Sequence, residues 1–75
     1  MAEHRLDCYG EACPIPLLKA EKKMKTLAVG DTLVVLTDHS CAMKNVPDWA
    51  RKQGYDVDLD ETGDGEWEIY IIKNH

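Results

Sequence analysis

The chain has 75 residues, of which 44% are hydrophobic and 31% are charged, and its formal net charge is −5. A chain of this size buries only about 60% of its unfolded surface, so we expect one small domain spanning residues 1–75. No apolar run approaches the roughly 20 residues of a membrane span, and the acidic balance argues against direct binding of nucleic acid, whose phosphates require clustered positive charge.

The N-terminal residues and the cysteine count indicate in which cellular compartment the protein is expected. Residues 1–5 lack the long apolar core of a secretory signal, which predicts a cytoplasmic protein. Three cysteines cannot form a closed set of disulfides, and a reducing compartment keeps such residues as thiols. We therefore treat them as candidates for chemistry rather than for structural cross-links.

A short strand and a turn lead to the most informative cysteine. Residues 4–8 alternate in polarity and place Leu6 and Cys8 on one face, which predicts a first strand. Gly10 lies in the turn that follows, where it can take a positive φ and lets a partner approach a nearby thiol. A plain turn glycine also explains this residue. The chain then reaches Cys13.

Cys13 occupies a position that favours reactivity. Pro14 fits the first helical position and pushes Cys13 into the extended backbone of an N-cap residue. Pro16 removes a second first-turn donor. The positive end of the helix dipole favours a thiolate, so Cys13 is the predicted nucleophile. In the alternative, Cys13 only starts a helix and its thiol is a small buried hydrophobe.

A helix and a central strand follow this cysteine. Apolar side chains that recur every three or four residues predict a helix over residues 14–28, namely Leu17, Ala20, Met24 and Leu27. The β-branched run at residues 32–37 is apolar at consecutive positions, as in a central strand that is buried on both faces. A strand, helix and strand in this order make the two strands parallel.

The parallel arrangement predicts a shared site. Parallel strands bring their C-terminal ends to one edge of the sheet, where ligands bind in open α/β folds. Cys13 follows the first strand, and the loop containing His39 and Cys41 follows the second. We therefore expect these two loops to be neighbours.

A second helix is predicted from the apolar residues between positions 42 and 50, with its end at Gly54. Pro47 complicates its start, because an interior proline costs a helix about 3 kcal/mol. We therefore predict a short entry turn and a helix that begins near Asn45, with Pro47 in its first turn. A kink at Pro47 is the alternative.

The C-terminal part predicts a β-hairpin. Val57 and Leu59 alternate with aspartates in a third strand, a turn follows at residues 62–65, and a fourth strand ends near Lys73. The expected fold is therefore an α/β (α+β) two-layer sandwich with the order β-α-β-α-β-β, in which two helices cover one face of a four-stranded mixed sheet.

The remaining titratable residues carry weaker signals. Cys8 is predicted to point into the core, whereas Cys41 is either a second thiol of the site or an ordinary first-turn residue. His39 could act as a base towards Cys13, although an exposed histidine is the favoured interpretation. The paired Cys-x₂-Cys spacing of a zinc site is absent, so we predict no metal, and no cofactor is implied.

Charge is distributed unevenly along the chain. Acidic residues crowd the C-terminal third, whereas the first predicted helix carries four lysines: Lys19, Lys22, Lys23 and Lys25. Solvated surfaces explain both runs. Docking of a partner protein on the lysines is the alternative.

Residues 6–16 resemble the signature of the TusA/SirA-like sulfur-carrier family, L-D-x-x-G-x-x-C-P-x-P. The likeness extends over nearly the whole chain, because a Gly-Asp-x-Leu stretch at 30–33, a Val-Pro pair at 46–47 and a terminal hairpin also match the family. Glu11 departs from many relatives, which carry an apolar residue there, and its carboxylate is expected to raise the pKa of a nearby thiol or to repel a particular partner.

The resemblance implies a sulfurtransferase in which Cys13 holds sulfane sulfur as a persulfide and relays it, with Gly10, Pro14, Pro16 and Cys41 as candidate supporting residues. It implies a donor, either a protein of the cysteine desulfurase or rhodanese type or thiosulfate itself, and an acceptor protein. Thiosulfate use and transfer-RNA thiolation are both compatible uses. Residues 45–50 are similar to YeeD-type members associated with a membrane thiosulfate-uptake protein, which adds a transporter to the possible partners. The competing hypothesis is a non-catalytic interaction or regulatory module that presents the first helix.

Overall fold

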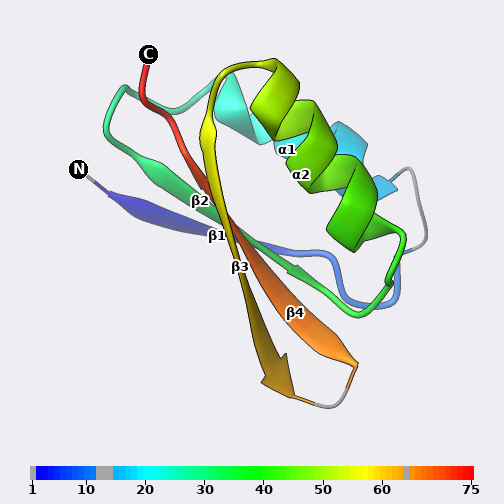
Figure 1. The fold of residues 1–75 in the computed structure, drawn as a ribbon. Helices are drawn as coiled ribbons and strands as arrows, with labels where there is room; N and C mark the ends of the chain where they lie inside the picture. Colours follow the sequence, from blue (N-terminus) through cyan, green and yellow to red (C-terminus); the bar gives the residue numbers. More distant parts are fainter. Residues whose placement is uncertain (1, 12–14, 64) are drawn as a thin grey trace.

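The computed structural model describes residues 2–11, 15–63 and 65–75, and Figure 1 shows their arrangement. The elements occur in the predicted order: β1 (Glu3–Asp7), α1 (Ile15–Met24), β2 (Thr32–Thr37), α2 (Ala42–Lys52), β3 (Asp56–Gly63) and β4 (Glu66–Ile72). Within these described residues, neither helix is long and apolar enough to cross a membrane.

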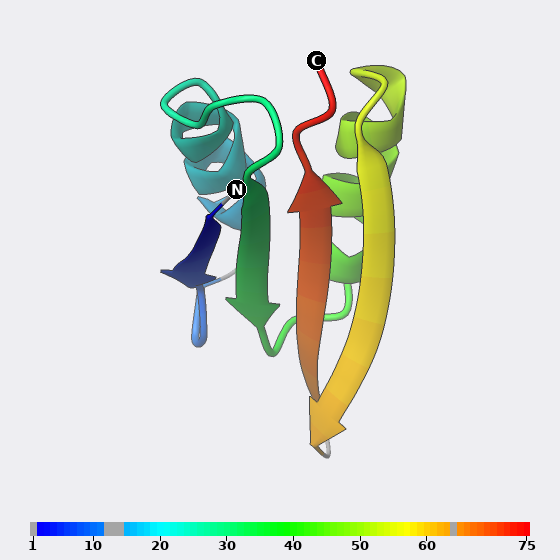
Figure 2. The same ribbon diagram turned by 90° about the vertical axis from the view of Figure 1, so that its left-hand side faces the viewer.

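The four strands form one mixed sheet with the order β1-β2-β4-β3. β1 runs parallel to β2, whereas β4 is antiparallel to both β2 and β3. Figure 2 shows both helices on the same face, with α1 over the β1 and β2 side and α2 over the β4 and β3 side. The predicted two-layer sandwich is therefore confirmed.

The core lies between the sheet and the two helices. Leu6, Leu17, Met43 and other half-buried side chains pack around its fully buried part. That buried part consists of Cys8, Ala20, Met24, Leu27, Leu33, Val35, Ala42, Val46, Ala50, Ile69 and Ile71. The helical spacing in α1 and the alternation in β2 and β4 explain this set, because both periods bring apolar side chains to one face.

The central strand β2 is buried on both faces, as predicted. Val34 is fully buried although it points away from the helices, where the strand register places it between Arg5 and Tyr70. The side chains above it are joined by hydrogen bonds, because Glu68 accepts from Arg5 Nη2 at 2.9 Å and from the Tyr70 hydroxyl at 2.6 Å. This network covers the apolar centre of the open sheet face.

Helix α1 ends at Met24, four residues before the predicted end. The amide of Thr26 bonds to the carbonyl of Lys23 at 3.0 Å and that of Leu27 to Met24 at 3.3 Å, so the last turn tightens to i→i+3 bonds. Lys73 Nζ also donates to the carbonyl of Met24 at 2.8 Å. Leu27 nevertheless enters the core, because the tight turn keeps it on the same side.

The predicted start of helix α2 near Asn45 is wrong. The helix begins at Ala42 and contains Pro47 in its interior. The amide of Asn45 already bonds to the carbonyl of Cys41 at 3.0 Å, which closes the first turn. Pro47 lacks the N–H that would bond to the carbonyl of Met43. Its ring is fully buried, and we attribute the tolerance to this packing.

The terminal hairpin is longer than predicted. β3 continues to Gly63 with an irregularity in its register between Glu61 and Gly63. Figure 1 shows that the end of the hairpin extends beyond the helices. Leu59, predicted on the buried face, is 40% exposed, because β3 is an edge strand and its neighbour on one side is solvent. The predicted turn includes residue 64, which lies outside the described residues.

Candidate functional site

The two loops that follow β1 and β2 meet at one edge of the sheet. The amide of Cys8 bonds to the carbonyl of Leu36 at 2.7 Å, which keeps the chain beside β2 after β1 has ended. Two residues later, the Gly10 amide donates to Asp38 Oδ1 at 2.8 Å. The expected contact between these loops is therefore confirmed for the described residues.

Local sequence explains the shape of the first loop. The carboxylate of Asp7 accepts from the amide of Tyr9 at 3.0 Å, and the amide of Glu11 bonds to the carbonyl of Cys8 at 3.2 Å. Gly10 has a φ of 76°, a conformation that strains any residue with a Cβ atom. Its turn geometry agrees with the prediction, whereas its role at a reactive thiol stays a prediction.

The second loop is shaped by short-range bonds as well. The buried hydroxyl of Thr37 accepts from the amide of His39 at 3.2 Å, and the amide of Ala42 bonds to the carbonyl of His39 at 3.1 Å as α2 begins. Cys41 is the exposed N-cap residue of α2. The imidazole of His39 is 43% exposed and lies 3.9 Å from the Asp38 carboxylate.

Cys13 and Pro14 lie outside the described residues, so the predicted N-cap role of Cys13 stays a prediction. The residues on either side are described. Helix α1 begins at Ile15, which is 41% exposed, and Pro16 is fully buried in the first turn. A buried proline with a restricted φ anchors the start of α1 against the core.

Glu11 forms an ion pair that the sequence did not predict. Its carboxylate accepts a hydrogen bond from Lys19 Nζ, which lies on α1. This hydrogen bond raises the pKa of Lys19, so the lysine remains charged. The positive charge only partly offsets the carboxylate of Glu11, which still raises the pKa of the neighbouring Cys8 thiol. The two residues are separated by a turn and a helix start, so no periodic spacing could reveal the pair.

Cys8 is a core residue, as predicted. Its side chain is fully buried, and burial together with the nearby carboxylate of Glu11 raises the pKa of its thiol to about 11. At neutral pH such a thiol stays protonated, and a thiol is a poor nucleophile. Cys8 is therefore excluded as the reactive cysteine of the native protein.

We expect native protein treated with iodoacetamide at pH 8 to remain unmodified at Cys8, since a pKa of about 11 leaves about one thiol in a thousand ionised. Cys8 should alkylate readily in urea. Peptide mapping by mass spectrometry measures both results. Because the unfolded chain ionises this group first, the stability should also fall as the pH rises from about 9 to about 11. Rapid native alkylation of Cys8 would contradict this assignment.

Comparisons with known proteins identify the family to which these loops belong. The family model described as sulfurtransferase TusA matches residues 4–73. The chain belongs to this family. It is 36% identical over 73 residues to a candidate sulfur carrier protein of Methanocaldococcus jannaschii, with 97% of each chain covered. It is 32% identical over 74 residues to the candidate sulfur carrier TsuB of Escherichia coli, covering 97% of this chain and 99% of that one.

A solved structure agrees with this assignment. The crystal structure of a SirA-like protein from Desulfitobacterium hafniense superposes on this TusA-family chain with a TM-score of 0.87, 29% identity and complete coverage of both chains. The predicted relationship to TusA and SirA-like proteins is therefore confirmed. Family membership supports a role in carrying or transferring sulfur.

A metal site is a separate question. Among residues 2–11, 15–63 and 65–75, no group of three or more histidine, cysteine or acidic side chains is placed to hold a metal ion.

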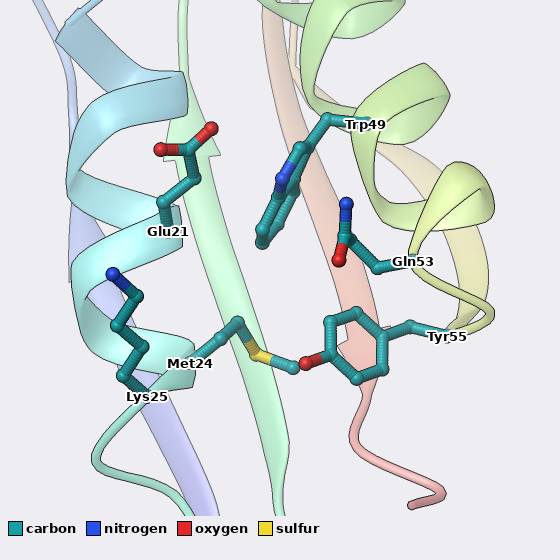
Figure 3. A pocket seen from close by; sticks show the side chains of 6 residues that line it. All are labelled: Glu21, Met24, Lys25, Trp49, Gln53 and Tyr55. Atoms are coloured by element: carbon teal, nitrogen blue, oxygen red, sulfur yellow. The ribbon is translucent and has the colours of Figure 1, made fainter.

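A groove between the helices is a second feature of this TusA-family protein. It has a volume of about 250 Å³ and lies towards the C-terminal ends of α1 and α2, away from the loops that meet at Asp38. Figure 3 shows α1 side chains facing those from α2 across the groove. The lining consists of Glu21, Met24, Lys25, Trp49, Gln53 and Tyr55. Tyr55 also stacks on His75 with ring centroids 5.0 Å apart, which fixes the ring from behind.

Proposed function

We propose that this TusA-family protein is a sulfurtransferase that holds sulfane sulfur as a persulfide on Cys13 and relays it to an acceptor protein. The observation that carries the proposal is the hydrogen bond between Gly10 and Asp38, which ties the loop leading to the motif cysteine to the loop after β2. Helix α1 begins two residues after Cys13. Cys8, which lies five residues before Cys13 in the sequence, is buried and its thiol is protonated at neutral pH.

The proposed chemistry needs only one nucleophilic thiolate. The Cys13 thiolate attacks the outer sulfur of a donor persulfide, the donor sulfur–sulfur bond breaks, and the donor leaves as a thiolate. With thiosulfate as donor, sulfite leaves and Cys13 again becomes a persulfide. The acceptor thiolate then attacks the outer sulfur of Cys13 and releases the Cys13 thiolate. Positive charge at the start of α1 would stabilise both anionic forms of Cys13.

The donor and the pathway are finer parts of the proposal. Residues 45–50 resemble the branch associated with thiosulfate uptake, which favours thiosulfate as donor and a membrane thiosulfate-uptake protein as partner. Delivery of sulfur from a cysteine desulfurase or rhodanese-type protein towards transfer-RNA thiolation is the second pathway. Both operate in the cytoplasm, where thiols stay reduced.

Intact-protein mass spectrometry tests the proposal directly. The protein is incubated with thiosulfate, or with a cysteine desulfurase and cysteine, and then mapped by peptide fragmentation. We expect a mass increase of about 32 Da on the peptide that contains Cys13, reversed by dithiothreitol, because one sulfur atom is added. The donor that loads sulfur onto the protein then identifies the pathway. No adduct from either donor, while Cys13 alkylates normally, would contradict the relay.

The competing function is a non-catalytic interaction module. The three lysines that line a cleft beside α1 favour it, because a positive surface on an acidic protein suits docking. In that case Cys13→Ser would leave both partner binding and biological activity intact. A sulfur carrier instead keeps binding and loses transfer in the same variant. Measuring both quantities therefore separates the two functions.

A further inference from the structure

An open cleft lies beside α1, on the side of the helix that faces the sheet edge at β1. It has a volume of about 430 Å³, and its lining consists of Leu6, Lys19, Lys22, Lys23 and Thr26. Leu6 is half-buried and supplies an apolar surface, whereas three ammonium groups supply positive charge. The hydroxyl of Thr26 is engaged locally, because it donates to the carbonyl of Lys23 at 2.7 Å.

The lysines of this cleft differ in whether they form an ion pair within the chain. Lys19 pairs with Glu11. Within the described part of the chain, Lys22 and Lys23 form no ion pair; Lys22 is exposed and Lys23 is half-buried. Their charges are therefore available to a ligand. A ligand that bears carboxylates could approach them without displacing an internal carboxylate.

Charge is separated across the molecule. The cleft lies over the β1 side of the sheet, whereas β3, at the opposite edge, carries Asp56, Asp58, Asp60 and Glu61 and no basic residue. Figure 2 shows β1 and β3 at the two edges, with α1 on the β1 side. Because the whole chain has a charge of −5, a negatively charged partner is repelled elsewhere and attracted here.

The cleft adjoins the loop that leads to Cys13. Lys19 forms one end of its lining and bonds to Glu11, which precedes Cys13 by two residues. Lys22 and Lys23 follow one turn further along α1. A segment that occupies the cleft therefore has one end close to the loop that leads to Cys13.

We propose that this cleft docks an acidic segment of the protein that exchanges sulfur with Cys13. The segment would place an apolar side chain over Leu6 and carboxylates against Lys22 and Lys23. The identity of the partner rests on the proposed relay, whereas the docking itself does not require sulfur. Such docking orients the partner thiol, because an acidic segment is repelled by the acidic β3 edge and attracted to the lysines of the cleft.

Binding of a synthetic peptide tests the docking without any sulfur chemistry. The probe is a rhodamine-labelled peptide, Glu-Asp-Leu-Glu-Asp, and its control is Gln-Asn-Leu-Gln-Asn. Fluorescence anisotropy at low salt measures the dissociation constant for the full chain. We expect binding of the acidic probe only, weakened by added salt, because exposed ion pairs are screened beyond about 10 Å at 0.1 M ionic strength.

Matched charge reversals locate the bound peptide. Lys22→Glu and Lys25→Glu change the net charge equally and lie three residues apart, but Lys25 lines the groove between the helices instead of the cleft. We expect Lys22→Glu to weaken binding by roughly fivefold or more, and the charge-matched Lys25→Glu by no more than about twofold. Circular dichroism checks that each variant folds.

Several results would overturn the docking proposal. These are equal weakening by Lys22→Glu and Lys25→Glu, binding of the neutral control peptide, or no binding of the acidic probe at low salt. Tighter binding of a short single-stranded RNA, with the same dependence on Lys22, would assign the cleft to phosphate instead. The test is independent of persulfide loading, so a protein that loads sulfur but fails these assays refutes the docking alone. A protein that binds the probe but never loads sulfur refutes the relay alone.

Discussion

Cys13→Ser is expected to abolish sulfur loading, with the adduct of about 32 Da reduced by at least about 100-fold for every donor that loads the wild-type protein. A serine hydroxyl ionises far above neutral pH and cannot form a persulfide. The variant replaces one sulfur atom by oxygen and nearly keeps the size of the side chain, so the fold should persist. Intact-mass spectra of the two proteins under identical loading conditions measure the difference.

Cys8→Ala is the matched control for that experiment. It also removes one thiol, but the thiol is buried in the core and protonated, so the adduct should form at the wild-type level. The small cavity should lower stability by only about 1–2 kcal/mol. Loss of loading in Cys8→Ala with a retained fold would show that Cys8 takes part in the relay. Retention of the adduct in Cys13→Ser would place the sulfur on another residue.

Ile69→Ala is expected to destabilise the protein by about 2–5 kcal/mol, because it removes a fully buried side chain from the core and leaves a cavity. Ile69 lies in β4 between Val35 and Leu59 in the strand register, in the part of the core that α2 covers. Small domains have only roughly 5–15 kcal/mol of net stability, so this loss brings the fold close to unfolding. Urea titration followed by tryptophan fluorescence gives the free energy of unfolding.

Leu59→Ala is the control for the core variant. Leu59 is paired directly with Ile69 across the β3–β4 ladder, yet 40% of its surface is exposed because β3 is an edge strand of the sheet. We expect it to cost only about 1 kcal/mol, since less apolar surface is lost. Equal effects of Ile69→Ala and Leu59→Ala would mean that the helices do not define the buried core.

Much of the fold follows from sequence patterns whose physical cause is local. The consecutive β-branched residues of β2 predicted a strand buried on both faces, and Thr32–Thr37 has the predicted bounds. The helical spacing predicted the buried residues Ala20, Met24 and Leu27. The order of elements predicted the parallel β1 and β2 pair and hence the meeting of their loops at Gly10 and Asp38.

The candidate site was predictable in part for the same reason. Its cysteine is marked by a run of neighbouring residues, and the comparisons confirmed the family that this run indicated. The ion pair of Glu11 with Lys19 and the cleft lined by Lys22 were not predictable. Both join residues from different elements, and their proximity depends on how α1 packs beside the turn after β1.

The sequence by itself therefore determined the elements, their order, the core-facing residues and the motif cysteine, because each depends on residues that are close in the chain. Tertiary structure decided where α2 begins, since the burial of Pro47 offsets a lost backbone bond that propensity alone counts as a break. It also decided the exposure of Leu59 and the protonation of Cys8. These properties depend on which neighbours exclude water, and those neighbours come from distant parts of the chain.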